Sequence, residues 1–291
     1  MTVFPVVLAL LAATFWAAGM VVTKAGLRQT DLSAFALARW TFALIIFLVY
    51  GGATGTLHFP SAGLVGMAGL AGVVDSFLGG LTYLSALSTS PAHQVAPLAN
   101  TAPFWGVVAA VVILGEHPSA IAFLAAALVV GGTVLLVPTR RAASVAKGSW
   151  RGPVLALITG LLWGFSEIGP ARFCLDRGME PVSFMIVFSA AAGLCWACLV
   201  GSLSRRRPLR VTGRGLGVAV VVAVLGSGLG WTLWLTGLRL APASLLAPVR
   251  GATVLFSFLF SAVLLRERLT WRAGAGATLV FAGVFMVTTL S

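Results

Sequence analysis

The sequence is poor in charge, and poorest in acids. Only 9% of its 291 residues are charged, with 7 Asp or Glu against 19 Lys or Arg. Average chains carry roughly 25% charged residues. Hydrophobic residues make up 59% of the chain, and its longest polar stretches are only Pro138–Arg151 and Ser204–Arg214. This composition leaves no room for a soluble domain and indicates a helical protein that crosses the membrane many times.

Cysteine is also scarce, and no metal-binding pattern is present. Of Cys174, Cys195 and Cys198, the last two lie three apart in an apolar run, which is more typical of packing than of redox chemistry. No His, Cys and carboxylate cluster has the spacing of a zinc site. We therefore expect no metal and no cofactor. Met1–Pro5 contains no Lys or Arg, so the first apolar run does not resemble a cleaved signal peptide.

Long apolar runs fill most of the chain. A membrane helix needs about 20 apolar residues. By this criterion the sequence predicts an all-α integral membrane protein with ten transmembrane helices, over residues 3–23, 32–51, 62–87, 91–114, 119–137, 152–173, 181–203, 213–237, 242–265 and 271–289.

Basic residues gather in every second link between these helices. The odd-numbered links hold most of them, and the even-numbered links hold only Arg172, Arg177 and Arg239. The positive-inside rule then places the odd links in the cytoplasm and both termini on the periplasmic or extracellular side. The net charge of +12 needs no nucleic-acid partner, because cytoplasmic flanks account for most of it.

The chain also repeats itself at a constant offset. Four pairs lie 151 positions apart: Tyr83/Trp234, Pro91/Pro242, Pro97/Pro248 and Glu116/Glu267. The predicted halves are residues 1–144 and 145–291. Each half holds five helices, an odd number, so the second half enters the membrane from the opposite side. Such an inverted repeat around a central cavity is a pattern of secondary transporters.

These features resemble the drug/metabolite transporter superfamily, in particular its ten-helix EamA-type exporters. The resemblance covers nearly the whole chain and is carried by Trp163-Gly164, by Pro242 and Pro248, and by Leu264–Leu269 running into Gly274 and Gly283. The first half departs from the pattern, with Trp16-Ala17 in place of Trp-Gly. Length and aromatic content are most similar to the YddG-type aromatic amino acid exporters. The resemblance implies an inner-membrane carrier with a central cavity lined by helices one, three, four, six, eight and nine.

One stretch, Leu161–Arg172, combines an acid, an indole and a helix breaker within an apolar run. A charged group at mid-membrane depth costs about 2.5–3.5 kcal/mol on insertion scales, so Glu167 is expected to face a polar cavity. It could carry a proton or bind an ammonium group. The alternative is a protonated or paired structural residue. Trp163 lies one turn earlier on the same face, and Gly169-Pro170 predicts a break in the helix.

Four aromatic residues form two repeat-related pairs: Trp16, Tyr83, Trp163 and Trp234. Together they predict a flat, apolar substrate pocket that can stack a ring or hold a cation. The alternative is a belt of residues at the membrane interface.

Polar residues within apolar runs are the remaining candidates. His93 and Asn100 share one face of the fourth helix, and Ser244 lies on the ninth. We expect them to contact substrate, although interhelical hydrogen bonding is the alternative. Asp75 and Arg250 are possible proton carriers or members of a charge pair, although Asp75 could also cap a helix or form a pair near the membrane surface.

Two other kinds of charged residue are assigned no substrate role. Arg39 is expected to extend to the membrane interface. Glu116 and Glu267 are expected to anchor loops.

Together the patterns predict an exporter of small amphipathic metabolites, amino acids with aromatic or apolar side chains, that works by alternating access. Its partners are then the substrate and the lipid bilayer. A carrier of organic cations or nucleotide sugars is the alternative. An intramembrane enzyme is disfavoured, because Asp75, His93 and Glu167 lie on three helices with no catalytic motif around them.

Overall fold

The computed structural model describes residues 3–90, 95, 98–136, 150–265 and 271–290. Over these ranges the chain is helical, with short links and no strand. Eight of the described helices are long and apolar enough to cross a membrane, and two shorter apolar helices span Ala102–Leu114 and Ala120–Leu136. The predicted all-α membrane fold is confirmed.

The first half contains five membrane segments, the third of which is a continuous run of α-, π- and α-helix. Its described elements are α1 (Val3–Leu27), α2 (Leu32–Thr54), α3 (Ala62–Gly72), the π-helix η1 (Val73–Gly79), α4 (Gly80–Thr89), α6 (Ala102–Leu114) and α7 (Ala120–Leu136).

The second half repeats this order, and its third segment again contains a π-helix. Its elements are α8 (Arg151–Asp176), α9 (Pro181–Ser204), α10 (Gly213–Val222), η2 (Ala223–Gly230), α11 (Trp231–Leu240), α12 (Ala243–Arg250), α13 (Ala252–Leu265) and α14 (Trp271–Leu290). The π-helices end at Gly79 and Gly230, which lie 151 positions apart. Helices of the π type are rare in proteins, and those that occur are often found at functional sites. Their recurrence at equivalent positions therefore marks this level of the bundle as a candidate functional site.

The expected helix break at Gly169-Pro170 is wrong, because α8 runs unbroken through Pro170 to Asp176. Proline is tolerated inside a membrane helix when neighbouring groups satisfy the backbone groups it frees. The α8 helix is packed against α3, η1, α4 and α6. The break occurs instead in the ninth segment, where α12 ends and α13 begins on either side of Gly251.

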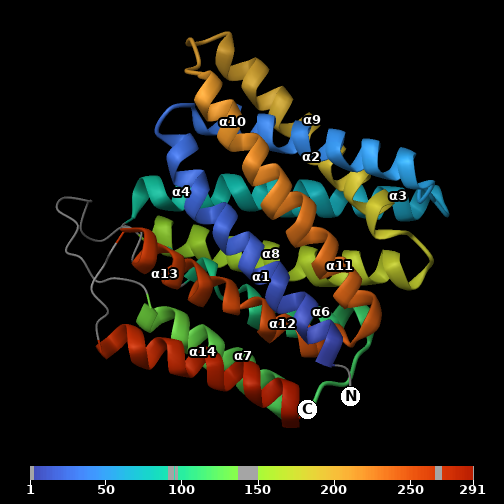
Figure 1. Ribbon diagram of the computed structural model, residues 1–291, viewed down its shortest axis with the longest axis vertical. Helices are drawn as coiled ribbons and strands as arrows, with labels where there is room; N and C mark the ends of the chain where they lie inside the picture. Colours follow the sequence, from blue (N-terminus) through green and yellow to red (C-terminus); the bar gives the residue numbers. More distant parts are fainter. Residues whose placement is uncertain (1–2, 91–94, 96–97, 137–149, 266–270, 291) are drawn as a thin grey trace.

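The helices form one bundle, with α7 and α14 side by side at one end and α2, α9 and α10 at the other (Figure 1). The helices α1 and α8 lie between these ends, and the two termini lie close together on one side of the molecule. This placement agrees with an even number of membrane crossings.

Contacts between α7 and α14 are repeated across the two halves. A Cβ built on Gly132 would lie 2.7 Å from the carbonyl oxygen of Gly276, and a Cβ on Gly283 would lie 2.7 Å from that of Ala125. Gly132 and Gly283 are 151 positions apart, as are Ala125 and Gly276. The same close backbone contact is therefore made twice, as a two-fold relation between inverted halves requires. Small residues allow such close approach of membrane helices.

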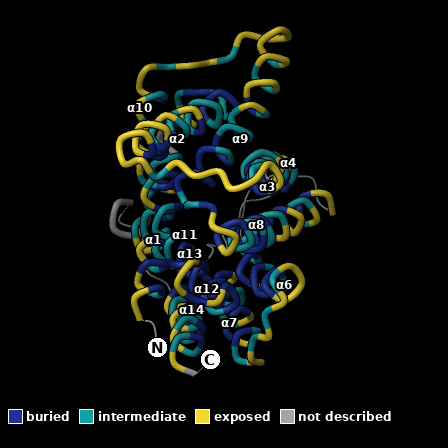
Figure 2. Tube along the Cα trace, turned by 90° about the vertical axis from the view of Figure 1, so that its right-hand side faces the viewer, coloured by how far each residue is buried: buried dark blue, intermediate teal, exposed yellow. Residues whose placement is uncertain are grey.

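Burial is greatest along the middle of the bundle and falls toward its outer faces (Figure 2). The largest fully buried side chains include Trp196, Trp234, Phe184 and Phe188. Large apolar residues such as Leu70, Val112 and Phe281 are exposed on the outside, as expected of surfaces that face lipid tails.

Candidate substrate cavity

A cavity of about 180 Å³ lies at the centre of the bundle, at the level of the two π-helices. The helices of both halves contribute to its wall. The lining residues are Trp16, Gly19, Met20, Thr23, Arg39, Trp40, Asp75, Ser76, Gly80, Asn100, Trp163, Glu167, Val222, Gly226, Trp231, Arg250 and Thr253.

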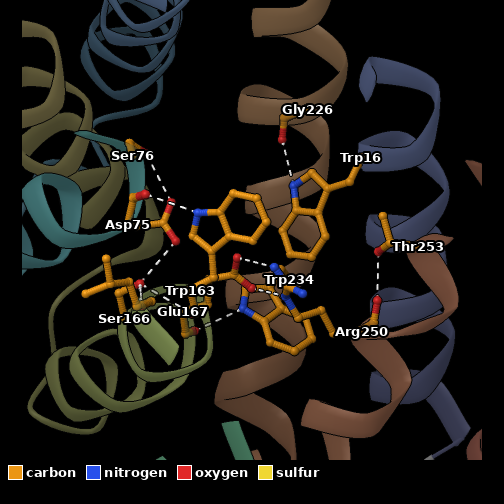
Figure 3. Close-up of polar contacts among 11 residues, drawn as sticks. Trp16, Asp75, Ser76, Trp163, Ser166, Glu167, Gly226, Trp234, Arg250 and Thr253 are labelled. Carbon is orange, nitrogen blue, oxygen red and sulfur yellow. Dashed lines mark hydrogen bonds and ion pairs between the residues drawn. The ribbon is translucent and has the colours of Figure 1, made fainter. Parts of the chain in front are cut away.

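A buried ion pair between Glu167 on α8 and Arg250 at the end of α12 forms one part of the wall (Figure 3). The contact is bidentate: Nη2 of Arg250 lies 2.5 Å from one carboxylate oxygen, and Nε donates to the other. Only 6% of Glu167 and 9% of Arg250 are exposed. A bidentate guanidinium–carboxylate contact fixes both side chains in one geometry, so each is held by the other.

The second buried acid, Asp75 in η1, receives hydrogen bonds from two hydroxyls among the described residues. Ser76 donates to Oδ1 at 3.0 Å, and Ser166 of α8 donates to Oδ2 at 3.1 Å. Ser166 also donates to the carbonyl of Leu162 at 2.6 Å, so its single proton is shared. No Lys or Arg lies within ion-pair distance of Asp75 in the part of the chain that the structure describes.

Two lining indoles are fixed by the π-helices in the same way. Trp163 donates from Nε1 to the carbonyl of Asp75 at 3.2 Å, and Trp16 donates to the carbonyl of Gly226 at 3.0 Å. Positions 75 and 226 are repeat-related. Each bond joins one half of the protein to the other, and Figure 3 shows both indoles near the centre of the site.

The other two predicted aromatic residues lie behind the wall, not in it. Trp234 is fully buried, donates to the carbonyl of Glu167 at 3.2 Å, and has its ring 5.6 Å from that of Trp16. The ring of Tyr83 lies 5.5 Å from that of Trp163. Each therefore supports a lining indole, and the two contacts are again repeat-related.

Two further indoles, Trp40 and Trp231, line the cavity although the sequence pattern does not single them out. Neither has an aromatic repeat partner, and Trp231 corresponds to Gly80 in the first half. A search guided by repeated residues could not find them.

The expected interfacial position of Arg39 is wrong. Its side chain turns into the protein, where Nε donates to Oγ of Ser227 at 3.2 Å and the guanidinium lies 4.8 Å from the ring centre of Trp40. Arg39 lines the cavity. The sequence could not predict this inward orientation, because a long basic side chain near the start of a membrane helix can extend either to the interface or into the protein.

The remaining predicted residues are placed differently. Asn100 lines the cavity. Ser244 does not: its hydroxyl donates to Glu116 at 2.6 Å, and Glu116 also accepts from the backbone amides of Ala243 and Ser244. Glu116 thus caps α12 and anchors the link after α6, as expected of it. His93 lies outside the described residues, as do Glu267 and the predicted boundary between residues 144 and 145.

The cavity extends toward the α1–α2 link, which lies against the α9–α10 link. Its lining runs along one face of α1 from Trp16 to Thr23, about 10 Å at 1.5 Å per residue. Met20 on this face is 48% exposed. In the other direction, toward the C-terminal end of α11, Leu235 and Leu238 are fully buried.

The described lining residues are of kinds that bind an amphipathic ligand. They combine indole faces with two guanidinium groups and two carboxyl groups. Among the described residues, no three His, Cys, Asp or Glu side chains lie close enough to hold a metal ion.

Comparison with known proteins agrees with this description. The sequence model of the EamA-like transporter family matches residues 3–137 and again residues 150–289. An uncharacterized transporter of Archaeoglobus fulgidus is 23% identical over 290 residues, which cover 97% of both chains. The uncharacterized protein PA1977 of Pseudomonas aeruginosa is 29% identical over 174 residues, covering 60% of this chain and 56% of its own. One crystal structure covers 98% of both chains with a TM-score of 0.79 at 18% identity, a likeness of fold alone.

Proposed function

Since the chain belongs to the EamA-like transporter family, we propose that this membrane transporter exports small amphipathic metabolites, namely amino acids with aromatic or other apolar side chains. The observation that carries the proposal is the central cavity, where four indoles and four charged side chains share one wall. Indole faces bind apolar rings and chains, and buried charges bind the polar end of an amphipathic molecule.

Alternating access is the proposed mechanism, with residues 1–144 and 145–291 as the two moving halves. Two inverted copies of one scaffold can exchange conformations, and the exchange moves the opening from one face to the other. The bonds of Trp16 and Trp163 to the opposite half lie at the cavity, and they are contacts that such an exchange would have to keep or remake. In the conformation described here the cavity extends toward the basic α1–α2 and α9–α10 links, so an exporter would load its substrate from that side.

The proposed location is the inner membrane, with the basic links in the cytoplasm and both termini outside. Cysteine labelling tests this orientation in a variant whose native cysteines are replaced by serine. Ser204→Cys, at the end of α9 beside a basic link, should resist an impermeant thiol reagent in intact cells, whereas His58→Cys in an even link should react. Both positions are exposed, so accessibility within the protein is matched. The reverse labelling pattern would invert the proposed orientation.

A carrier of organic cations is the second candidate, favoured by the carboxyl of Asp75 beside Trp163. An indole face and a carboxylate together bind a cation well. The two candidates differ in whether the ligand must also carry a carboxylate.

Transport by purified protein in liposomes decides between them. The panel contains tryptophan, phenylalanine, leucine and a quaternary ammonium compound, each measured with and without a pH gradient. We expect uptake of apolar amino acids, and we expect Trp163→Ala to reduce it because stacking supplies about 1–3 kcal/mol of binding. Uptake of the quaternary ammonium compound alone would replace the proposal with the second candidate.

A further inference from the structure

The charges of the cavity are balanced in number but not in position. Its wall holds two guanidinium groups, Arg39 and Arg250, and two carboxyl groups, Asp75 and Glu167. Arg250 and Glu167 form a bidentate pair and satisfy each other. Arg39 and Asp75 remain as the separated positive and negative groups of the site.

Arg39 has no carboxylate partner among the residues that the structure describes. Its contacts are one neutral hydroxyl, that of Ser227, and the face of Trp40. It interacts electrostatically with Asp75, yet the two side chains are too far apart to form an ion pair. A guanidinium carries five N–H donors, so most of its capacity is available to a ligand. Its planar fork matches a carboxylate.

The carboxylate of Asp75 likewise has hydrogen-bond acceptor sites left for a ligand. A carboxylate offers about four acceptor sites, and two hydroxyls occupy only part of them. One of these, from Ser166, shares its proton with a backbone carbonyl. The carboxyl group lies in a wall of the cavity beside the indole of Trp163 (Figure 3).

We infer that the cavity recognises net-neutral dipolar ligands, with Arg39 binding the carboxylate of the substrate and Asp75 binding its ammonium group. This inference rests on the proposed function and names the two residues that would set its substrate class. A dipolar ligand supplies a partner to both wall groups at once. A cation would leave Arg39 without a counter-charge, and an anion would leave Asp75 without one. The apolar side chain would then lie against the indoles of Trp16 and Trp163.

Binding of matched ligands tests the two roles separately. The ligands are radiolabelled L-tryptophan, tryptamine, which lacks the carboxylate, and indole-3-propionate, which lacks the ammonium. The wild-type protein should bind tryptophan at least about tenfold more tightly than either analogue, since a hydrogen bond to a charged group contributes that much or more. Equal affinity for tryptophan and tryptamine would overturn the inference.

Variants then assign each group. Arg39→Gln should abolish the preference for tryptophan over tryptamine by weakening tryptophan binding, and should not weaken tryptamine binding. Asp75→Asn should abolish the preference over indole-3-propionate by weakening tryptophan binding, and should not weaken binding of indole-3-propionate. A merely structural role would weaken all three ligands by one factor, which would count against the assignment. Arg39→Lys keeps the charge but loses the planar fork, and should retain part of the preference.

Matched controls lie outside the cavity. Arg177 is exposed and rests on Phe173, and Asp176 is exposed and pairs with Arg172. Arg177→Gln and Asp176→Asn change charge in the same way and should leave all three affinities as they are.

A second set of ligands separates this inference from the proposed function. Leucine, isopentylamine, which lacks the carboxylate, and 4-methylpentanoate, which lacks the ammonium, repeat the binding comparison with an aliphatic side chain. Tryptophan or leucine transported without discrimination against the truncated analogues would remove the inference and keep the function. Discrimination with leucine but no binding of tryptophan would keep the inference and remove the aromatic preference. Failure of every amino acid and analogue to bind or be transported would overturn both.

Discussion

The two repeat-related sides of the cavity have the same frame and different chemistry. On one side, which we call the Asp75 side, Trp163 bonds to the carbonyl of Asp75. On the other, the Gly226 side, Trp16 bonds to the carbonyl of Gly226. Both indoles lie against a glycine at the end of a π-helix. A Cβ on Gly79 or on Gly230 would come within 2.6 Å of the indole nitrogen.

The side chains around this frame differ sharply. On the Asp75 side, Ser166 donates to the carboxyl of Asp75. The equivalent residues on the Gly226 side are Gly19 and Gly226, and because glycine has no side chain they cannot form this hydrogen bond. The difference continues one residue on, where Glu167 of the Asp75 side corresponds to Met20 of the other.

The comparison shows that the two sides share their helix-packing contacts but differ in the polar residues that face the cavity. The repeated indole contacts hold the halves together on both sides, so they are retained in both copies. Among the described residues, the two carboxyl groups lie on the Asp75 side, whereas the charged group beside Gly226 is the guanidinium of Arg39, which donates to Ser227. The Gly226 side stays open, and the cavity extends along it past Gly19 and Met20 to Thr23.

The largest expected effect comes from breaking the ion pair of the Asp75 side. Glu167→Gln leaves Arg250 buried without a counter-charge, which should lower the free energy of unfolding by about 3–5 kcal/mol. Denaturation in detergent micelles measures the loss. The double variant Glu167→Gln/Arg250→Gln should recover part of it. Met20→Gln, at the equivalent position of the Gly226 side, should have a much smaller effect. Equal losses at residues 20 and 167 would contradict the comparison.

The next effect concerns the frame that both sides share. Gly79→Ala and Gly230→Ala should each destabilise the protein by about 1–3 kcal/mol, because the added methyl group forces an indole to move. The two losses in thermal stability should be similar. Gly66→Ala and Gly217→Ala are matched controls with nothing near the added methyl. If only one of the first pair destabilises the protein, the two contacts are not equivalent.

A smaller effect is expected from the hydroxyl that distinguishes the two sides. Ser166→Ala removes one hydrogen bond to Asp75 and should cost about 1 kcal/mol of stability. By freeing an acceptor site on the carboxyl, it should also leave binding of ammonium ligands intact. Equilibrium unfolding and tryptamine binding check both parts. Complete loss of tryptamine binding would show that Ser166 contacts the ligand itself.

The smallest effect on stability should follow from introducing a serine at Gly19, the position on the Gly226 side that is equivalent to Ser166. A Cβ on Gly19 would lie 3.7 Å or more from its nearest neighbours, which is ordinary contact. Gly19→Ser should therefore change stability by less than about 0.5 kcal/mol. Uptake into liposomes should nevertheless fall, because the side chain narrows the cavity. Unchanged transport of every substrate would place the substrate path away from the Gly226 side.

The sequence by itself determined the membrane segments, the repeat and part of the site. Apolar length fixes where a helix can cross lipid, since backbone groups must be satisfied within the helix. Acids inside apolar runs are costly enough that their positions in the sequence mark Asp75 and Glu167 as candidates. Residue pattern likewise marks Trp16, Trp163 and Asn100, and all three lie at the cavity.

The tertiary structure decided which of these residues meet and which way they point. Glu167 and Arg250 are 83 positions apart, and no local pattern pairs them. Arg39 near a helix start can reach the interface or the interior, and the hydroxyl of Ser227 and the ring of Trp40 hold it inside. Tyr83 lies behind Trp163, which lines the cavity, with the two ring centres 5.5 Å apart. The π-helices are likewise a tertiary outcome, since the indole N–H groups that bond to their carbonyls come from the opposite half of the chain.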